Sequence, residues 1–288
     1  MRRTRAFGLG LLGLLILAVG WELYKSFGPE SGVVVGDRAI TPRTGDRAMP
    51  HLWEMGSRLF APAVGRTGDP LWSRILEASL FSLKIAAAGW VIGLVVGVAL
   101  ALLMQRLRLA EAAILPWVVL SQTVPLIAIA PLVRRWGAQI TIGSFEWDSR
   151  HSVAVIAAYL AFFPVAVGML RGLKSPDATH LDLMRSYGIG WGRTLLRLRL
   201  PASVPYLLPA LRLAAASAVI GTVVAEVSIG LRGGIGRLIL DYAQAAGGDP
   251  AKPWAPIFGA ILIGLVAAGF VSLIGLGLRP YRRSEAPV

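Results

Sequence analysis

The sequence predicts an all-α membrane protein with six transmembrane helices, and three observations lead to this fold class. Hydrophobic residues make up 55% of the 288 residues, and the mean hydropathy of +0.64 exceeds the range of ordinary soluble domains. Six segments contain about 20 mostly apolar residues, the length that crosses a bilayer as a helix. None of the segments alternates with a period of two, so a transmembrane β-barrel is not predicted.

The six predicted spans are separated by polar or Gly- and Pro-rich stretches. Two of the spans are long enough to tilt or to extend beyond the bilayer. Within the apolar run 207–221 the only charged residue is Arg212, near one end. In chain order the predicted spans are 7–24, 75–104, 112–133, 153–170, 204–229 and 254–278.

These spans divide the chain into an N-terminal helix (1–27), an outer linker (28–74), a transmembrane domain (75–278) and a tail (279–288). The basic start followed by an apolar run is also found in cleaved signal peptides. No small-x-small cleavage site follows this run, which favours a retained anchor. Within the linker, 51–60 is predicted to be a short helix lying at the membrane interface.

The distribution of Lys and Arg predicts the orientation. If the N-terminus is cytoplasmic, the inner segments hold 14 Lys and Arg in 52 residues, and the outer segments hold 13 in 92. Cytoplasmic loops carry the excess of basic residues, so both termini are predicted to be cytoplasmic. The net charge of +13 is then explained by topology and lipid contact, and nucleic acid is not predicted as a partner.

The most informative polar interruption is the basic loop that begins at Ser175. An Arg at the centre of a bilayer costs about 2.5–3.5 kcal/mol, so the chain has to leave the membrane here. Ser175, Pro176 and Asp177 form a typical helix start, with a capping hydroxyl, a proline in the first turn and an acid near the positive end of the dipole. The apolar side chains that follow at a spacing of three are Leu181, Met184 and Tyr187.

A second short helix is expected after a glycine turn at Gly188 and Gly190, and it is expected to end at Pro201. One of its faces is apolar and another is basic, as in a surface that docks a soluble protein. The apolar side chains are Trp191, Leu195 and Leu198, and the basic ones are Arg193 and Arg197.

This loop resembles the cytoplasmic EAA loop in permease subunits of bacterial ATP-binding cassette (ABC) importers. The pattern of that family is E-A-A, three residues, Gly, nine residues, an aliphatic residue, any residue, and Leu-Pro. Gly188, Leu198, Leu200 and Pro201 stand at the expected positions. The triplet reads Asp182-Leu183-Met184 and keeps only the acid.

Other stretches are similar to the branch of this family that imports nitrate, sulfonates, taurine and pyrimidine-type vitamin precursors. They are 121–137, 200–226 and the GGIG sequence of 233–236. The resemblance implies the type I ABC importer permease architecture, with the loop 175–201 inserted into a groove on the ATPase. The coupling residues that it implies are Asp182, Met184, Arg185, Tyr187, Gly188, Trp191, Leu200 and Pro201.

The resemblance also implies the partners and the location. A dimer of ABC ATPase subunits would bind ATP and Mg²⁺, and this chain itself would need no cofactor. A second permease copy (in a homo- or heterodimer), a solute-binding protein and the bilayer complete the expected partners. The complex would import a small organic or anionic solute across the bacterial inner membrane, and the wording of the loop is closest to members that handle pyrimidine-like precursors.

Residues that could catalyse a reaction or bind a metal are not found in the sequence. It has no cysteine and no G-x-x-x-x-G-K-[ST] phosphate loop, and no G-x-S-x-G elbow. The three histidines, His51, His151 and His180, lie in separate loops without the spacing of metal ligands. No enzymatic activity is therefore predicted, and energy for transport has to come from a partner.

Four polar residues within or beside the spans are candidates for the translocation path. Lys84 could bind a substrate anion or pair with another helix. Gln122 and Thr123 precede Pro125, where a broken helix could line a cavity or simply kink. Glu226 could be structural, line the path, or pair with Arg232 or Arg237 at the outer interface.

Two questions are left open by the sequence. Arg134 and Arg135, with the long segment 138–150, could contact a binding protein, attract anions or anchor the chain at the interface. The rival function is an ion-gradient-driven secondary transporter or channel, which would use midplane charges and often internal repeats. The chain shows no convincing repeat and few midplane charges.

Overall fold

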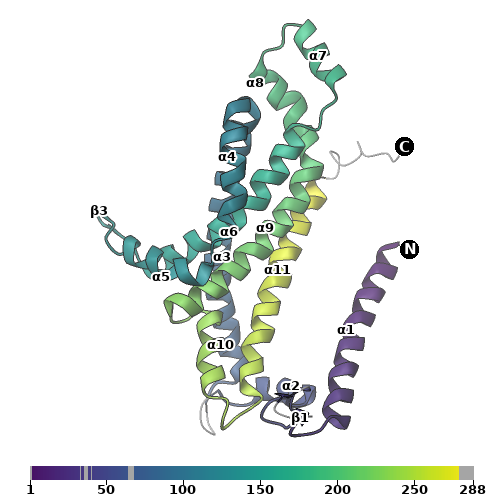
Figure 1. Cartoon of the computed structure of the whole chain (residues 1–288), viewed down its shortest axis with the longest axis vertical. Coiled ribbons are helices and arrows are strands. Elements are labelled where there is room, and N and C mark those ends of the chain that lie inside the picture. The colour runs from purple at the N-terminus through teal and green to yellow at the C-terminus, as the bar shows by residue number, and fades with distance from the viewer. Residues whose placement is uncertain (1, 33, 36–37, 40, 64–67, 279–288) are drawn as a thin grey trace. The chain divides into compact units, whose positions relative to one another are not determined.

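A computed structural model of the chain describes residues 2–32, 34–35, 38–39, 41–63 and 68–278 (Figure 1). The predicted tail 279–288 lies outside the described residues. The chain forms two compact units, which are described separately. The first consists of Met1–Glu77 with Leu238–Gly259, and the second of Ala78–Arg237 with Ala260–Val288.

Helices dominate both units, as the sequence predicts. The helices are α1 (Arg2–Phe27), α2 (Leu52–Phe60), α3 (Leu71–Arg106), α4 (Arg108–Ser121), α5 (Leu126–Gly137), α6 (Ser149–Leu173), α7 (Ala178–Ser186), α8 (Trp191–Thr194), η1 (Leu195–Arg199), α9 (Leu200–Ile229), α10 (Ile235–Gln244), η2 (Lys252–Trp254) and α11 (Ala255–Gly277). The strands in the described residues form two short antiparallel pairs, β1 (Val34–Val35) with β2 (Arg38–Ala39) and β3 (Thr141–Ile142) with β4 (Phe145–Glu146).

In the first unit, polar contacts tie the end of α1 to the linker that follows it. The Lys25 ammonium lies 2.5 Å from a carboxylate oxygen of Asp46, and the Glu22 carboxylate lies 2.8 Å from His51 Nδ1. The predicted helix at 51–60 is observed as α2, in which Trp53 and Phe60 are exposed. Its position at a membrane interface stays a prediction.

In the second unit, α6 is the central helix and packs along α9. Glycines on α3 allow α6 to approach closely: a Cβ at Gly93 would stand 2.7 Å from Ala161 Cβ and 3.0 Å from Ala158 O. A Cβ at Gly172 would likewise meet Ser203 on α9 at 2.7 Å. Small residues at these crossings therefore let the helix backbones approach closely.

Among the described residues, five helices are long and apolar enough to cross a membrane, or six if the bent pair α4–α5 counts as one span. The predicted span 112–133 corresponds to this pair, in which two helices meet at an angle of 104° (Figure 1). Residues 122–125 form the break, and Pro125 explains it because proline has no N–H and disfavours helical geometry in the residue before it. The carbonyl of Ser121, freed at this break, accepts a hydrogen bond from the Tyr159 hydroxyl.

A correction concerns Pro201, which was expected to end the helix after the glycine turn. Instead, the helical run continues from Trp191 to Ile229 over 39 residues. Just before Pro201 the helix widens into the π-helical turn η1, in which the Leu200 N–H donates to the Leu195 carbonyl. The wider turn suits a residue without an N–H, so the proline begins α9 rather than stopping it.

The segment 138–150 forms a short hairpin, which was not predicted from the sequence, followed by the start of α6. Gly143 occupies its turn with φ +62°. Asp148 caps α6 by accepting hydrogen bonds from the N–H groups of Arg150 and His151. Arg134 Nη1 donates to the Ile229 carbonyl at 2.8 Å, which places a cation at the C-terminal end of α9.

Candidate functional site

The loop that contains α7 is exposed along its length. None of the side chains of α7 is buried. Leu183 and Tyr187, at 52% and 75% exposure, present apolar surface that the described residues leave uncovered. Asp182 and Arg185 pair across one turn at 3.1 Å on the exposed surface, while Met184 is half-buried. The helix therefore offers both apolar and charged groups to its surroundings.

The end of α7 has a defined geometry around Gly188. Gly188 has φ +66° and directly follows the last turn of the helix. Its N–H donates to the Arg185 carbonyl and the Ile189 N–H donates to the Met184 carbonyl, both at 2.9 Å. These two bonds form a Schellman motif, which glycine favours because the left-handed conformation is costly for residues with a Cβ. The glycine turn predicted from the sequence is therefore confirmed.

The segment that follows the Gly188 turn is held in place by Trp191, at the start of α8. Its Nε1 donates to Gln105 Oε1 at 3.2 Å, and the Arg106 guanidinium lies 4.5 Å from the centre of its ring. Both partners belong to the end of α3. A cation over an indole face contributes about 0.5–1 kcal/mol at an exposed site. Trp191 thus joins the loop to a helix that lies 86 residues away in sequence.

The base of the loop is held by two further contacts. The ammonium of Lys174, just after α6, pairs with the Glu111 carboxylate of α4. Arg199 Nη1 donates to the Leu173 carbonyl at 2.8 Å, which links η1 to the last residue of α6. Leu200 and Pro201 are half-buried at the start of α9. The loop that carries the exposed helix α7 is therefore attached to α4, α6 and η1.

Glu226 lies in a different environment, fully buried near the C-terminal end of α9. Its Oε1 accepts a hydrogen bond from Ser82 Oγ at 2.6 Å, and its Oε2 accepts one from the Gly236 N–H at 2.8 Å. Ser82 Oγ in turn accepts the Ile235 N–H at 2.8 Å. The carboxylate and the serine together satisfy the first N–H groups of α10, where the helix dipole favours an anion.

The glycines predicted as a GGIG motif make room for this carboxylate. Gly233 has φ +92°, and a Cβ on Gly234 would collide with the carboxyl group of Glu226. A Cβ on Gly236 would meet Oε2 at 3.1 Å. The complete burial of Glu226 favours a structural role over a role in the path. Of its two expected arginine partners, Arg232 is exposed, and the described chain gives it no ion pair.

The remaining path candidates lie on α3 and at the break between α4 and α5. Lys84 is exposed, and its ammonium makes no ion pair or hydrogen bond within the described residues. Thr123 Oγ1 donates to the Leu120 carbonyl at 2.8 Å, and Gln122 Nε2 donates to Ser121 Oγ at 3.2 Å. Gln122 and Thr123 thus place polar side chains at the bend between α4 and α5. Their role in the translocation path stays a prediction.

A comparison with protein families covers most of the second unit. Residues 93–280 match the family described as binding-protein-dependent transport system inner membrane component. The chain belongs to this family. The matched range contains both the α7 loop and Glu226 with its partner Gly236, so both features are part of the permease domain. The predicted importer permease, with its helical membrane fold, is thereby confirmed.

Two curated relatives and one solved structure are similar to this permease. ThiX of Halalkalibacterium halodurans, a formylaminopyrimidine transport permease protein, is 29% identical over 247 residues, covering 81% of this chain and 92% of ThiX. SsuC of Bacillus subtilis, named for the transport of aliphatic sulfonates, is 29% identical over 215 residues, covering 73% of this chain and 74% of SsuC. A chain in the crystal structure of an amino acid ABC transporter gives a TM-score of 0.55 at 18% identity, covering 73% of this chain and 94% of that one, and shows the fold alone.

Several residues that shape the permease were not found by sequence reasoning. Gln105 and Arg106 are the last two residues of α3 and look like an ordinary polar helix end. No neighbouring sequence feature indicates that they contact Trp191. Ser82 lies inside a span and is 144 residues from the carboxylate that it contacts. A polar residue within an apolar helix is the one signal that could have singled out Ser82.

Proposed function

We propose that this permease couples ATP hydrolysis on a partner subunit to import of a small organic or anionic solute. The observation that carries the proposal is the exposed helix α7, which buries none of its side chains, although the loop that contains it is anchored by Lys174 before the helix and by Trp191 after it. A surface of this kind suits a soluble partner that has to push on the membrane helices. By the family pattern, that partner is an ABC ATPase.

The coupling would work through the rigid attachment of the loop. Two ATPase subunits, binding ATP and Mg²⁺, would each hold one α7 in a surface groove. When the ATPase pair closes, the movement of α7 would pass through the Gly188 turn and the Trp191 contact to α3 and α9. Packed helices respond as rigid bodies, so such a movement can switch the path between inward- and outward-facing arrangements.

The assembly would contain two permease copies, identical or similar, with the path between them. A binding protein would deliver the solute from outside, and the α7 loop would face the cytoplasm of a bacterial cell, as the distribution of basic residues predicts. Lys84, Gln122 and Thr123 are the residues proposed to line the path. Lys84 would attract an anionic group, and the two polar residues at the α4–α5 bend would supply hydrogen bonds.

The solute class is proposed from the relatives together with the sequence. ThiX is named for formylaminopyrimidine transport and SsuC for the transport of aliphatic sulfonates. Both solutes combine a small carbon skeleton with polar groups, and the wording of the α7 loop favours the pyrimidine-like class. The exposed Lys84 fits a sulfonate as well as a ring carbonyl, so the two classes have to be separated by experiment.

The proposal is tested by isolating the permease from its own host in mild detergent and identifying the proteins that accompany it. We expect an ATPase with a phosphate-loop motif, which Trp191→Ala releases because the helix–loop contact with Gln105 is lost. The matched control is Trp136→Ala, which removes an exposed tryptophan from α5. Transport driven by an ion gradient without an ATPase, or equal ATPase recovery with Trp191→Ala and wild type, would overturn the proposal.

A further inference from the structure

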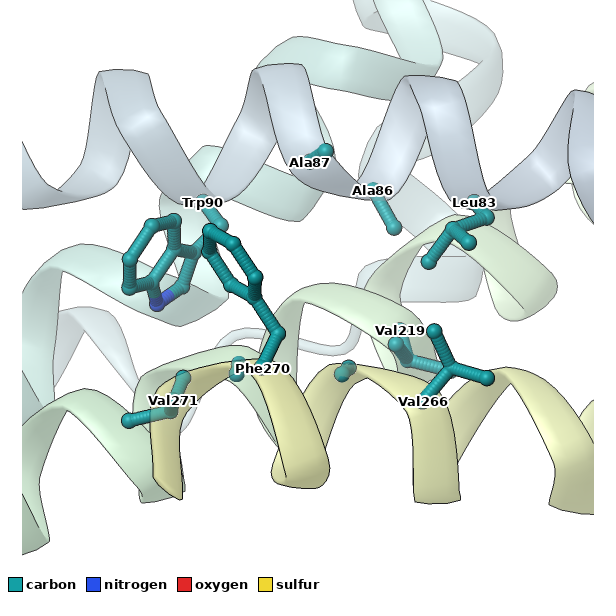
Figure 2. Close-up of a pocket in the computed structure, with 10 residues that line it drawn as sticks. Leu83, Ala86, Ala87, Trp90, Val219, Val266, Phe270 and Val271 are labelled. Carbon is teal, nitrogen blue, oxygen red and sulfur yellow. The ribbon is translucent and has the colours of Figure 1, made fainter. Parts of the chain in front are cut away.

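An apolar groove runs between α3, α9 and α11 in the second unit (Figure 2). Its volume is about 240 Å³, and every residue that lines it is apolar. Figure 2 shows Trp90 and Phe270 together at one end, with Leu83 and Val266 toward the other. Phe270 is 55% exposed and Val266 is 46% exposed, so the groove opens toward whatever surrounds the helices.

The one polar atom on these side chains is turned away from the groove by a hydrogen bond. Trp90 Nε1 donates to the Leu211 carbonyl at 3.2 Å, and the indole meets the Phe270 ring edge-on at a centroid distance of 6.2 Å. A cavity of about 150 Å³ with apolar walls stays free of water and accepts hydrocarbon. The α3–α9–α11 groove is therefore suited to hydrocarbon rather than to a polar solute.

A cation stands at the Trp90 end of the groove. Arg212 precedes the groove residue Ala215 by one turn of α9, and its Nη2 would lie 3.9 Å from a Cβ on Gly275 of α11. Arg212 is exposed, and within the described part of the chain it makes no hydrogen bond or ion pair. The apolar groove thus ends at a positive charge that the described residues do not neutralise.

The position of Arg212 along the spans places it near a membrane surface. Gly275 is two residues from the end of α11, a helix of 23 residues. At 1.5 Å per residue such a helix is about 34 Å long, close to the thickness of the hydrocarbon core. The guanidinium beside Gly275 therefore lies at the level of the lipid head groups, and the groove extends from there into the hydrocarbon.

We propose that the α3–α9–α11 groove binds one anionic phospholipid of the surrounding bilayer. An acyl chain occupies the groove against Trp90 and Phe270, and the phosphate pairs with Arg212. The charge of the head group complements the arginine, and hydrocarbon complements the apolar walls. The site goes beyond solute transport, because the lipid is a fixed component of the permease and not its cargo.

The first test compares lipid retention by the purified complex in nanodiscs of equal phosphatidylglycerol and phosphatidylcholine, using native mass spectrometry. We expect wild type to retain phosphatidylglycerol preferentially, and Arg212→Gln to lower that preference about fivefold, as expected for one basic residue at a membrane surface. Arg135→Gln removes an equal charge from exposed α5 and is expected to keep the preference. The same preference in wild type and Arg212→Gln would overturn the proposed head-group contact.

The second test addresses the groove itself. Phosphatidylglycerol with brominated acyl chains should quench the fluorescence of Trp90, so the quenched fraction should fall in Trp90→Phe. Ala87→Leu, which adds a side chain into the groove from α3, should reduce retention of both lipids. An equal quenched fraction in wild type and Trp90→Phe would show that protein, for example a second permease copy, covers the groove, and would overturn the proposal. Elution volume and helicity verify that each variant is folded.

Discussion

Two glycines near the ends of helices in this permease, Gly188 and Gly236, restrict substitution for different reasons. At Gly188, nothing lies within 4 Å of the position that a Cβ would occupy, and only the backbone conformation, with φ +66°, excludes other residues. At Gly236, the backbone is ordinary helix, but a Cβ would meet the Val223 carbonyl and the Glu226 side chain. Gly188 is exposed and conformationally restricted, whereas Gly236 is sterically restricted beside a buried carboxylate.

Gly236 therefore belongs to the core, whereas Gly188 is available to a partner. Residues around Gly236 are fixed by contacts within the chain, so changes there should affect stability first. Residues around Gly188 have open surroundings, so changes there should affect what binds α7 more than whether the permease folds. The variants below test this contrast, beginning with the largest expected effect on stability.

Gly236→Val should cause the largest loss of stability. Its side chain would overlap the Val223 carbonyl and push against Glu226, and overpacking of this kind costs about 3 kcal/mol when the backbone cannot move freely. Thermal unfolding of the detergent-purified protein measures the effect. Gly264→Ala is the control, because nothing lies within 4 Å of a Cβ at that position of α11. A Gly236→Val protein as stable as this control would contradict the steric account.

Glu226→Ala should be the next most damaging change, at about 2 kcal/mol, because Ser82 and the Gly236 N–H would lose their buried acceptor. Ser228→Ala on the same helix should have little effect, since that hydroxyl only returns to the Val224 carbonyl. Combining Glu226→Ala with Ser82→Ala tests the network directly. The double variant should lose less than the sum of the single losses, and strictly additive losses would show that the two side chains act independently.

Gly188→Val should cost only about 1–2 kcal/mol, the penalty of a left-handed conformation for a residue with a Cβ. Membrane insertion should be normal, while recovery of the proposed ATPase and solute uptake should fall about tenfold as the turn abandons its geometry. Gly190→Val is the matched control, because Gly190 has φ −69° and open surroundings. If both variants transport equally well, the geometry of the turn is not needed for coupling.

The smallest effect is expected at Asp46, in the first unit. The Lys25 ammonium, through a hydrogen bond and its charge, holds the pKa of the Asp46 carboxyl below its ordinary value. Its stabilising contribution is therefore present above about pH 4 and disappears as the pH falls through the lowered pKa. Asp46→Asn should remove this part of the pH dependence, measured as thermal stability between neutral and acidic pH. An unchanged profile would mean that solvent screens the pair completely.

Local sequence features predicted much of this molecule. Hydropathy located five spans, and the glycine signal at 188–190 located the turn after α7, because these features depend on neighbouring residues. The helix start predicted at Ser175 was wrong: α7 begins at Ala178, Pro176 precedes its first turn, and the Ser175 hydroxyl donates to the Gly172 carbonyl instead of capping α7. Pro125 indicated a break but not its angle of 104°, which depends on how α5 packs against α6 and α9. Pro201 was misread as a stop, since a π-helical turn of this kind has no simple sequence signal.

Long-range polar contacts were beyond the reach of the sequence. Ser82 and Glu226 are joined at 2.6 Å across 144 residues, and Trp191 and Gln105 at 3.2 Å across 86. A single sequence shows the donors and acceptors but not which of them meet. The candidate coupling surface could therefore be predicted as a loop, but its attachment to the end of α3 could not.

The composition of the long helical run that starts at Trp191 has a mechanical consequence. Its first half contains the π-helical turn and the prolines at 201, 205 and 209, so this part lacks several of the hydrogen bonds that stiffen a helix. From Leu211 to Ile229 the ladder is uninterrupted. The N-terminal half of the run is therefore expected to bend more easily than the C-terminal half, which carries Glu226. A force applied to the N-terminal half would bend the helix there and move the C-terminal half as a rigid body. Ser82 of α3 and Gly236 of α10, which are hydrogen-bonded to Glu226, would move with it.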